Sequence, residues 1–220
     1  EFNVTATFGG SIQYRNYMRK AQIADKLNLP GIYTLANSLN KVNVLDYRYE
    51  RQTNSLYGLI QLGWRNALFL DVTGRNDWSS TLPADNRSYF YPSVSGSVVL
   101  NELFDFGGSV LDLLKVRASW AQVGHDTSPY RYEEYLNSTA FPQGVSIPTI
   151  KPNNNLRPET VTSVELGADV HLFQNRLSAD VTWYDNKTTD LIAKMPISYS
   201  TGMNYIYTNA GSIRNRGIEI

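Results

Sequence analysis

His125 and Asp126 are the residues whose types best suit chemistry, because adjacent residues of these types can form part of a catalytic dyad. Such a dyad also needs a nucleophile and a third group that orients the base. Gly124 precedes the pair at the end of an alternating segment, which favours a strand that turns into a loop. We therefore expect a structural role for the pair and no catalytic residue. The other histidine, His171, has no further ligands nearby in the sequence, so we expect no metal site and no cofactor.

Three carboxylates, Asp71, Asp169 and Asp180, could act as general acids or bases, as in glycan hydrolysis. Each of them lies inside a segment that alternates apolar and polar residues, so we interpret them as charges on a hydrated face. The stretch GRNDWSS (74–80) lacks the layout of a glycine-rich phosphate loop, which a helix must follow. These residue types therefore predict a protein that is not an enzyme.

One polar segment, residues 125–159, is better suited to binding than to catalysis. Flat aromatic rings stack on the apolar faces of sugars, while neighbouring polar groups bond to hydroxyls. The same rings could instead pack on one another or on a protein that covers the loop. The candidate substrate-binding residues are Tyr130, Arg131, Tyr132, Glu134 and Tyr135, with Glu133 and Phe141 beside them.

The bulk composition excludes several classes of partner. Twenty Lys and Arg balance twenty Asp and Glu, for a formal net charge of +0, whereas a nucleic-acid-binding domain usually has a clear basic excess. The chain has no cysteine, so it can form neither disulfides nor a thiolate metal site. No run approaches the roughly 18 apolar residues of a membrane helix, but a membrane β-barrel needs no such run, because half of its strand residues are polar.

Strict alternation of apolar and polar residues is the main structural pattern. In RLSADVTWYDNKTTDLI (176–192), Leu177, Ala179, Val181 and Trp183 fall on one side of an extended chain. Such a period of two predicts antiparallel strands with two unlike faces, and hence an all-β fold. The pattern recurs in 2–8, 56–64, 68–75, 94–100, 114–120 and 164–172, and less regularly in 204–220.

The connections between these segments alternate in length. Tight turns are expected at Arg65-Asn66 and at Gln174-Asn175, and 101–112 has room for a helical turn. An array of hairpins gives this alternation when one rim carries functional loops and the other carries only turns. We expect one β-barrel domain over 1–220, with extracellular loops at about 15–46, 77–89, 125–159 and 195–204.

The orientation of the two faces decides between a soluble and a membrane protein. A soluble barrel or sandwich turns its apolar face inward, and a membrane barrel turns it outward to lipid. Here the apolar face carries no charge, and the polar face carries charges in mid-strand. Aromatic residues near strand ends favour the membrane, because such residues form interfacial girdles. These residues are Trp64, Trp78, Tyr89, Tyr91, Phe173 and Tyr184.

Five strings, in this order, resemble the barrel of SusC/RagA-type TonB-dependent outer-membrane transporters. The resemblance covers most of residues 47–220, and the first 46 residues match less clearly. It implies a transmembrane antiparallel barrel of about 22 strands, of which roughly eight belong to this chain. The strings are LDVTGRNDWSSTLP (70–83), YFYPSVSGS (89–97), LLKVRASWAQVG with DTSPY (113–130), NNNLRPETVTSVELGADVHLFQNRLSADVTWYDNKTTDLI (153–192) and NAGSIRNRGIEI (209–220).

The resemblance also implies a function and partners. The family takes up oligosaccharides or peptides through the outer membrane of Bacteroidota-type bacteria, with a SusD-like lipoprotein over the extracellular mouth and energy from the TonB complex. We expect the plug domain, which contacts TonB, and the final strands to lie outside these residues. Two alternatives stay open: a small closed outer-membrane barrel with a structural or adhesive role, and a secreted soluble β-sandwich that binds or cleaves glycans.

Overall fold

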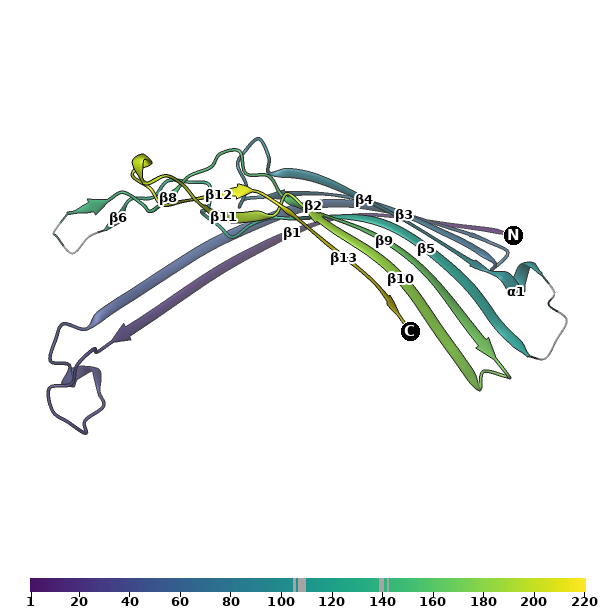
Figure 1. Ribbon diagram of the computed structural model, residues 1–220, viewed down its shortest axis with the longest axis horizontal. Coiled ribbons are helices and arrows are strands. Elements are labelled where there is room, and N and C mark those ends of the chain that lie inside the picture. The colour runs from purple at the N-terminus through teal and green to yellow at the C-terminus, as the bar shows by residue number, and fades with distance from the viewer. Residues whose placement is uncertain (105, 107–109, 139–140, 142) are drawn as a thin grey trace.

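The chain forms one curved antiparallel sheet, seen in a computed structural model that describes residues 1–104, 106, 110–138, 141 and 143–220 (Figure 1). Eight strands pair in the order β1-β2-β3-β4-β5-β9-β10-β13, so the expected number of about eight is confirmed. Every pairing between neighbours in this sheet is antiparallel. The strands are β1 (Phe2–Ile23), β2 (Asn43–Trp64), β3 (Leu68–Ser79), β4 (Ser88–Val99), β5 (Leu111–His125), β9 (Glu159–Leu172), β10 (Leu177–Thr189) and β13 (Ser212–Glu219).

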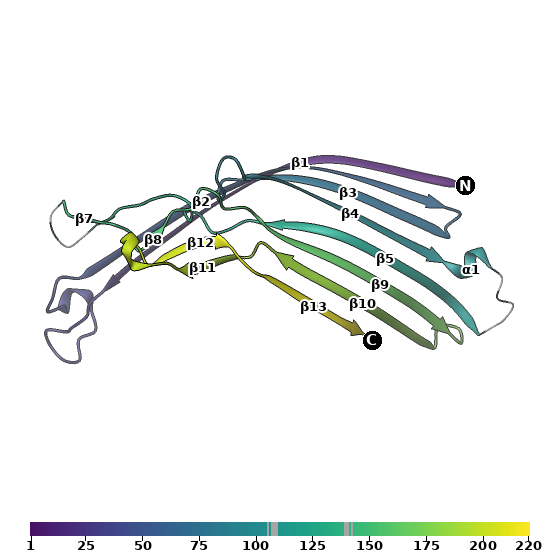
Figure 2. The ribbon, with the colours of Figure 1, turned by 45° about the horizontal axis from the view of Figure 1, so that its top comes forward.

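Short and long connections lie at opposite ends of this sheet, as the sequence predicts (Figure 2). At the turn end, Arg65 and Asn66 adopt φ angles of 52° and 54° to close the tight β2–β3 turn. The helical turn expected between β4 and β5 is α1 (Leu100–Leu103). The loop end carries η1 (Leu35–Asn37), β6 (Asn137–Ser138), β7 (Val145–Ser146), β8 (Ile150–Lys151), β11 (Ile192–Pro196), η2 (Tyr199–Thr201) and β12 (Tyr205–Asn209).

The expected bounds of three loops are wrong. Residues 15–23 and 43–46 are strand, because β1 runs to Ile23 and β2 begins at Asn43, which leaves a loop of 24–42. The 77–89 loop shortens to 80–87, and the 195–204 loop lies within a longer connection, 190–211, that contains β11 and β12. The expected 125–159 loop agrees closely with the connection between β5 and β9, residues 126–158, which we call the long loop.

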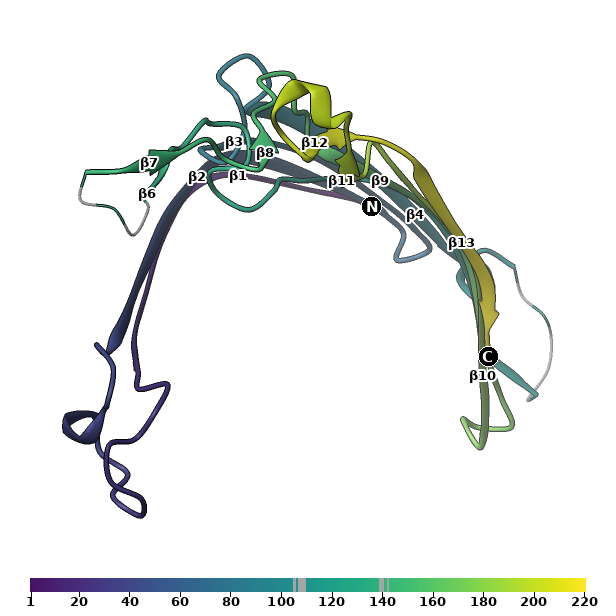
Figure 3. The same cartoon turned by 60° about the vertical axis from the view of Figure 1, so that its left-hand side comes forward.

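The β1–β2 hairpin extends well beyond the other strands at the loop end (Figure 3). Each of its strands has 22 residues, whereas about 9–11 residues suffice to cross a bilayer. From Tyr14 to Gln52 both faces carry polar side chains, so the apolar–polar alternation that identifies a half-buried strand stops there. This is why the sequence pattern alone assigned this part of the hairpin to a loop.

The apolar face of the sheet is uncovered, so the soluble β-sandwich alternative is wrong. Leu166, Val181 and Trp183 are 51%, 41% and 37% exposed. Among the residues that the structure describes, the only buried apolar side chains are Ala67, Leu82, Pro83 and Leu156, which is too few for the core of two packed sheets. Within those same residues, no helix is long and apolar enough to span a membrane.

The sheet is also open, because β1 and β13 each have a strand partner on one side only. A small barrel of eight strands would pair these two strands with each other. The closed small barrel is therefore not the arrangement that the described residues adopt.

Strand register separates the two faces cleanly. Val116, Ala168 and Val181 stand side by side across β5, β9 and β10 on the apolar face. One position away, on the polar face, Lys115 is opposite Asp169, and Asp169 is opposite Asp180. Asp169 and Asp180 thus lie on the hydrated face, as the sequence predicts. Their carboxylate oxygens form ion pairs with the Arg117 guanidinium, at 2.6 Å for Asp169 and 2.8 Å for Asp180.

Three of the six aromatic residues expected at the membrane interface lie on the polar face of the sheet and not on the apolar face. Tyr89 and Tyr91 are opposite Asp77 and Arg75 on the polar face, and the Tyr91 hydroxyl donates to Asp77 at 2.6 Å. Tyr184 is also on that face, where its ring lies over Gly217. Trp64 and Trp78 are on the apolar face, in register with Leu68 and Asn54. The position of a residue near a strand end does not show on which face of the sheet its side chain lies. The assignment of the three tyrosines to the lipid interface is therefore wrong.

Gly167 leaves room for the ion-pair network of Arg117. A Cβ at Gly167 would lie 2.4 Å from Nε and 2.8 Å from Cζ of Arg117, which bridges β9 to reach β10. We predict that Gly167→Ala displaces Arg117 and lowers the denaturant midpoint modestly, since solvent screens exposed ion pairs. Gly96→Ala is the matched control, because its Cβ would meet only a backbone oxygen at 3.8 Å. Unfolding of the full-length protein in lipid measures both, and equal midpoints would contradict this role of Gly167.

Candidate ligand-binding site at the loop end

Asp126 is the anchor of the loop end. Its side chain is 2% exposed, and one carboxylate oxygen lies 2.7 Å from Nη2 of Arg51 on β2. The other oxygen accepts hydrogen bonds from the hydroxyls of Ser79 and Thr81, the latter at 3.1 Å. The start of the long loop therefore crosses the ends of β4 and β3 on the polar face and is fixed to β2. The structural role expected for Asp126 agrees with this geometry.

The long loop and the 80–87 loop occupy the edge of β2 at Glu50 and Gln52, beyond the end of β3. The backbone N–H of Glu50 donates to the Tyr130 hydroxyl at 3.2 Å. Two residues along, the N–H of Gln52 donates to the Ser80 hydroxyl at 2.9 Å, and the Ser80 N–H donates to the Gln52 carbonyl at 2.9 Å. These contacts satisfy an edge that would otherwise pair with another chain.

Three of the five candidate residues meet in one cavity of about 300 Å³, which Tyr130, Arg131 and Tyr135 line. The Tyr130 and Tyr135 rings pack edge to face with centroids 5.6 Å apart. Arg131 lies over the ring of Tyr207, 4.4 Å from its centroid, which is a cation–π contact. Tyr207 comes from β12, and the sequence analysis missed it because it is 72 or more residues from the others in the chain.

The other two candidates, Tyr132 and Glu134, do not line this cavity. Glu133, which was given only as a neighbour, does, and it accepts a hydrogen bond from the Tyr135 hydroxyl. Burial and the adjacent Glu133 carboxylate raise the pKa of Tyr135, so this hydroxyl stays protonated and remains a donor at physiological pH. Glu134 is exposed to solvent.

A second cavity, of about 360 Å³, lies between the β1–β2 hairpin and the start of the long loop; we call it the rim cavity. Arg15, Tyr47, Tyr49 and Arg51 line it from the hairpin, and Asp126 to Pro129 line it from the loop. Arg131 lines both cavities, so the two adjoin. The sequence analysis missed the hairpin residues because it placed them in a loop.

The catalytic and metal hypotheses find no support in the geometry. His125 Nδ1 is 3.7 Å from Glu159, and His171 Nδ1 is 2.8 Å from Oδ1 of Asn175 at the turn end. Asp71 accepts a hydrogen bond from Gln61 at 3.2 Å. In the part of the chain that the structure describes, no three His, Asp or Glu side chains converge as metal ligands.

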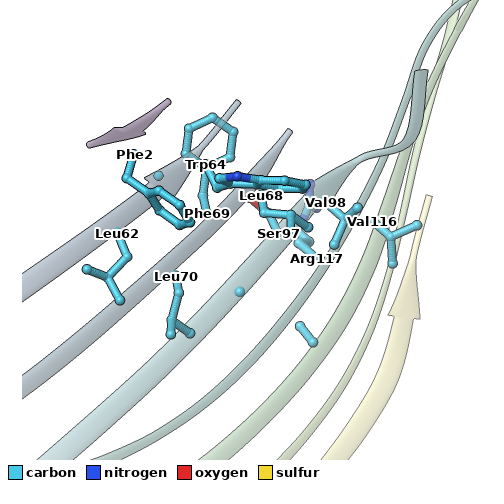
Figure 4. Close-up of a pocket in the computed structure, with 13 residues that line it drawn as sticks. Phe2, Leu62, Trp64, Leu68, Phe69, Leu70, Ser97, Val98, Val116 and Arg117 are labelled. Atoms are coloured by element: carbon cyan, nitrogen blue, oxygen red, sulfur yellow. The ribbon is translucent and has the colours of Figure 1, made fainter. Parts of the chain in front are cut away.

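A further hollow, of about 480 Å³, is almost entirely apolar and lies at the turn end (Figure 4). Leu62, Trp64, Leu70, Val98 and Val116 surround it, together with the small residues Gly96 and Ala118. These residues belong to the uncharged face of the sheet. An apolar hollow on that face suits acyl chains and not a polar cargo, so the binding hypothesis rests on the loop end.

Comparison with known proteins gives a consistent result. The family model described as TonB dependent receptor-like, beta-barrel, matches residues 1–220. TonB-dependent receptor P26 of Formosa agariphila is 32% identical over 197 residues, which are 86% of this chain and 20% of that protein. TonB-dependent receptor SusC of Bacteroides thetaiotaomicron is 27% identical over 184 residues, 75% of this chain and 18% of that protein.

A solved structure contains a curved sheet with the same fold as this chain. The structure of the RagAB peptide transporter superposes with a TM-score of 0.80 at 26% identity, over 99% of this chain and 25% of that chain. The chain thus spans about a fifth of the length of the curated relatives that it matches.

Proposed function

The chain belongs to the β-barrel family of TonB-dependent receptors, and from this premise we propose that it forms part of the wall of a transporter that takes up oligosaccharides or peptides. It is a section of a multi-pass β-barrel of the outer membrane, whose apolar face meets lipid and whose polar face lines the interior. The loop end is the extracellular end, because outer-membrane barrels place their long loops outside the cell.

One observation carries the proposal: Arg15, Tyr47, Tyr49 and Arg51, on the face of the sheet that lines the interior, form one wall of the rim cavity, and the cavity of Tyr130 and Tyr135 adjoins it through Arg131. Ser79, which is opposite Thr53, and Arg51, two residues before Thr53 on the same side of β2, hold the long loop on the polar face. The loop therefore folds over the mouth of the barrel, where tyrosines and arginines would meet an entering solute. Ligand sites commonly combine aromatic walls with a few placed polar groups.

We propose that this wall works with a SusD-like lipoprotein and with the TonB complex. The similarity to SusC and to the RagAB transporter supports both partners. An outer membrane with open porins holds no useful ion gradient, so energy for uptake has to come from an inner-membrane complex that acts through the periplasm. This segment supplies wall and outer loops and carries out no bond-making step.

Active uptake gives a direct test in the native bacterium. We expect labelled oligosaccharides or peptides to accumulate in the periplasm of wild-type cells and to fall to background when the gene is deleted. Collapse of the proton gradient by a protonophore should have the same effect, since the TonB complex draws on that gradient. The measurement is label in the osmotic-shock fraction, with a small porin-permeant solute as the control. Accumulation that persists without the gradient would contradict TonB-dependent uptake.

A further inference from the structure

The inner face of the projecting β1–β2 hairpin carries arginines, of which Arg15 and Arg19 form no ion pair among the described residues. Three arginines share this face, which continues the polar face of the barrel: Arg15, opposite Arg51, and Arg19, opposite Tyr47. Between residues 13–23 and 43–53, Asp46 and Glu50 are the acidic residues, and register places both on the other face with Lys20 and Arg48. The outer face is therefore balanced in charge, and the inner face is purely cationic.

The carboxylates that do reach this face from the long loop and β9 are already engaged. Asp126 is held by Arg51, Ser79 and Thr81. Glu159, which lines the rim cavity, accepts the backbone N–H of Ile192 at 2.7 Å. In the described ranges no ion pair involves Arg15 or Arg19. Like charges directly opposite each other destabilise a sheet; Asp126 offsets the charge of Arg51, and a bound anion would offset that of Arg15.

An aromatic platform stands next to these arginines. The Tyr17 and Tyr49 rings, opposite each other in register, stack with centroids 4.9 Å apart and planes at 18°. Tyr47 packs edge-on against Tyr49 at 6.0 Å. Tyr17 and Tyr47 stay 43% and 55% exposed, so their faces are open to a ligand.

We propose that this arginine–tyrosine face binds an acidic oligosaccharide by its carboxylate or sulfate groups. Guanidinium groups bind planar oxyanions with paired hydrogen bonds, and the rings offer apolar faces to the sugar. The inference rests on the proposed function, because it names the substrate class of the same transporter.

Two observations favour a glycan over other anionic partners. An extended peptide would bind best by adding a strand to a free sheet edge, but next to Arg51 and the rim cavity the edge of β2 is occupied at Glu50 and Gln52 by Tyr130 and Ser80. A folded lid protein cannot reach Arg15, Tyr47 and Tyr49 inside the rim cavity, which has a volume of about 360 Å³ and which the hairpin and the long loop line from two sides.

The test measures binding to the purified full-length protein by calorimetry. The probes are tetragalacturonate with its neutral methyl ester, and a κ-carrageenan tetrasaccharide with neutral neoagarotetraose. We expect one acidic probe to bind at least tenfold more tightly than its neutral counterpart, and Arg15→Gln or Arg19→Gln to weaken it about tenfold. Lys20→Gln, on the other face of the same strand, is the matched control and should leave affinity unchanged.

Three outcomes would overturn the inference: equal binding of acidic and neutral probes, tighter binding of tetraglutamate than of either glycan, or arginine variants that bind as the wild type does. Failure of the proposed function is a separate result. Gradient-dependent uptake of a neutral sugar that the arginine variants leave intact would sink only the anion site. A lack of any gradient-dependent uptake would sink the transporter proposal itself.

Discussion

Asp126→Ala is expected to release the long loop and to destabilise the loop end by about 3–5 kcal/mol, the cost of removing one partner from a buried ion pair. The carboxylate is 2% exposed on its side chain, and Arg51, Ser79 and Thr81 all bind it. Without it, the Arg51 guanidinium would stay partly buried without a counter-charge, and two hydroxyls would lose their acceptor.

Hydrogen exchange of the full-length protein in lipid gives the measurement. Peptides that cover Ser79 to Leu82 and the first residues of the long loop should lose protection, while peptides from the middle of β9 and β10 should keep theirs. Glu134→Ala is the control, because that carboxylate is exposed in the same loop. Unchanged exchange in the Asp126 variant would show that the anchor is dispensable.

A second change separates the two faces of the wall. Val116→Arg places a charge on the apolar face, in the row of Val116, Ala168 and Val181. An arginine on the lipid face of a β-barrel costs up to about 2–4 kcal/mol at the bilayer midplane and less toward the interfaces. We therefore expect a corresponding loss in the free energy of unfolding of the full-length protein in lipid vesicles.

Ser119→Arg, three residues along the same strand, is the matched control. Ser119 is opposite Glu165 and Ser95 on the polar face, where an arginine meets water and a carboxylate, so little change is expected. If Ser119→Arg were the costlier of the two, the faces would be assigned the wrong way round.

The sequence by itself determined the class of fold and the division of each strand into an apolar and a polar side. Alternation with a period of two is a local property, so the strands and their apolar sides follow from neighbouring residues alone. The lengths of the connections fixed which end carries loops. The resemblance of five short strings then indicated the family that the comparison confirmed.

Only the tertiary structure decided where the candidate site lies. Arg51 and Asp126 are 75 positions apart in the chain and meet because the long loop crosses two strand ends. Tyr207 reaches Arg131 in the same way, from β12. Beyond the membrane both faces of the β1–β2 hairpin contact water, so hydrophobic alternation disappears, although the strands continue to Ile23 and from Asn43. Contacts of this kind depend on register between distant segments, which no local pattern encodes.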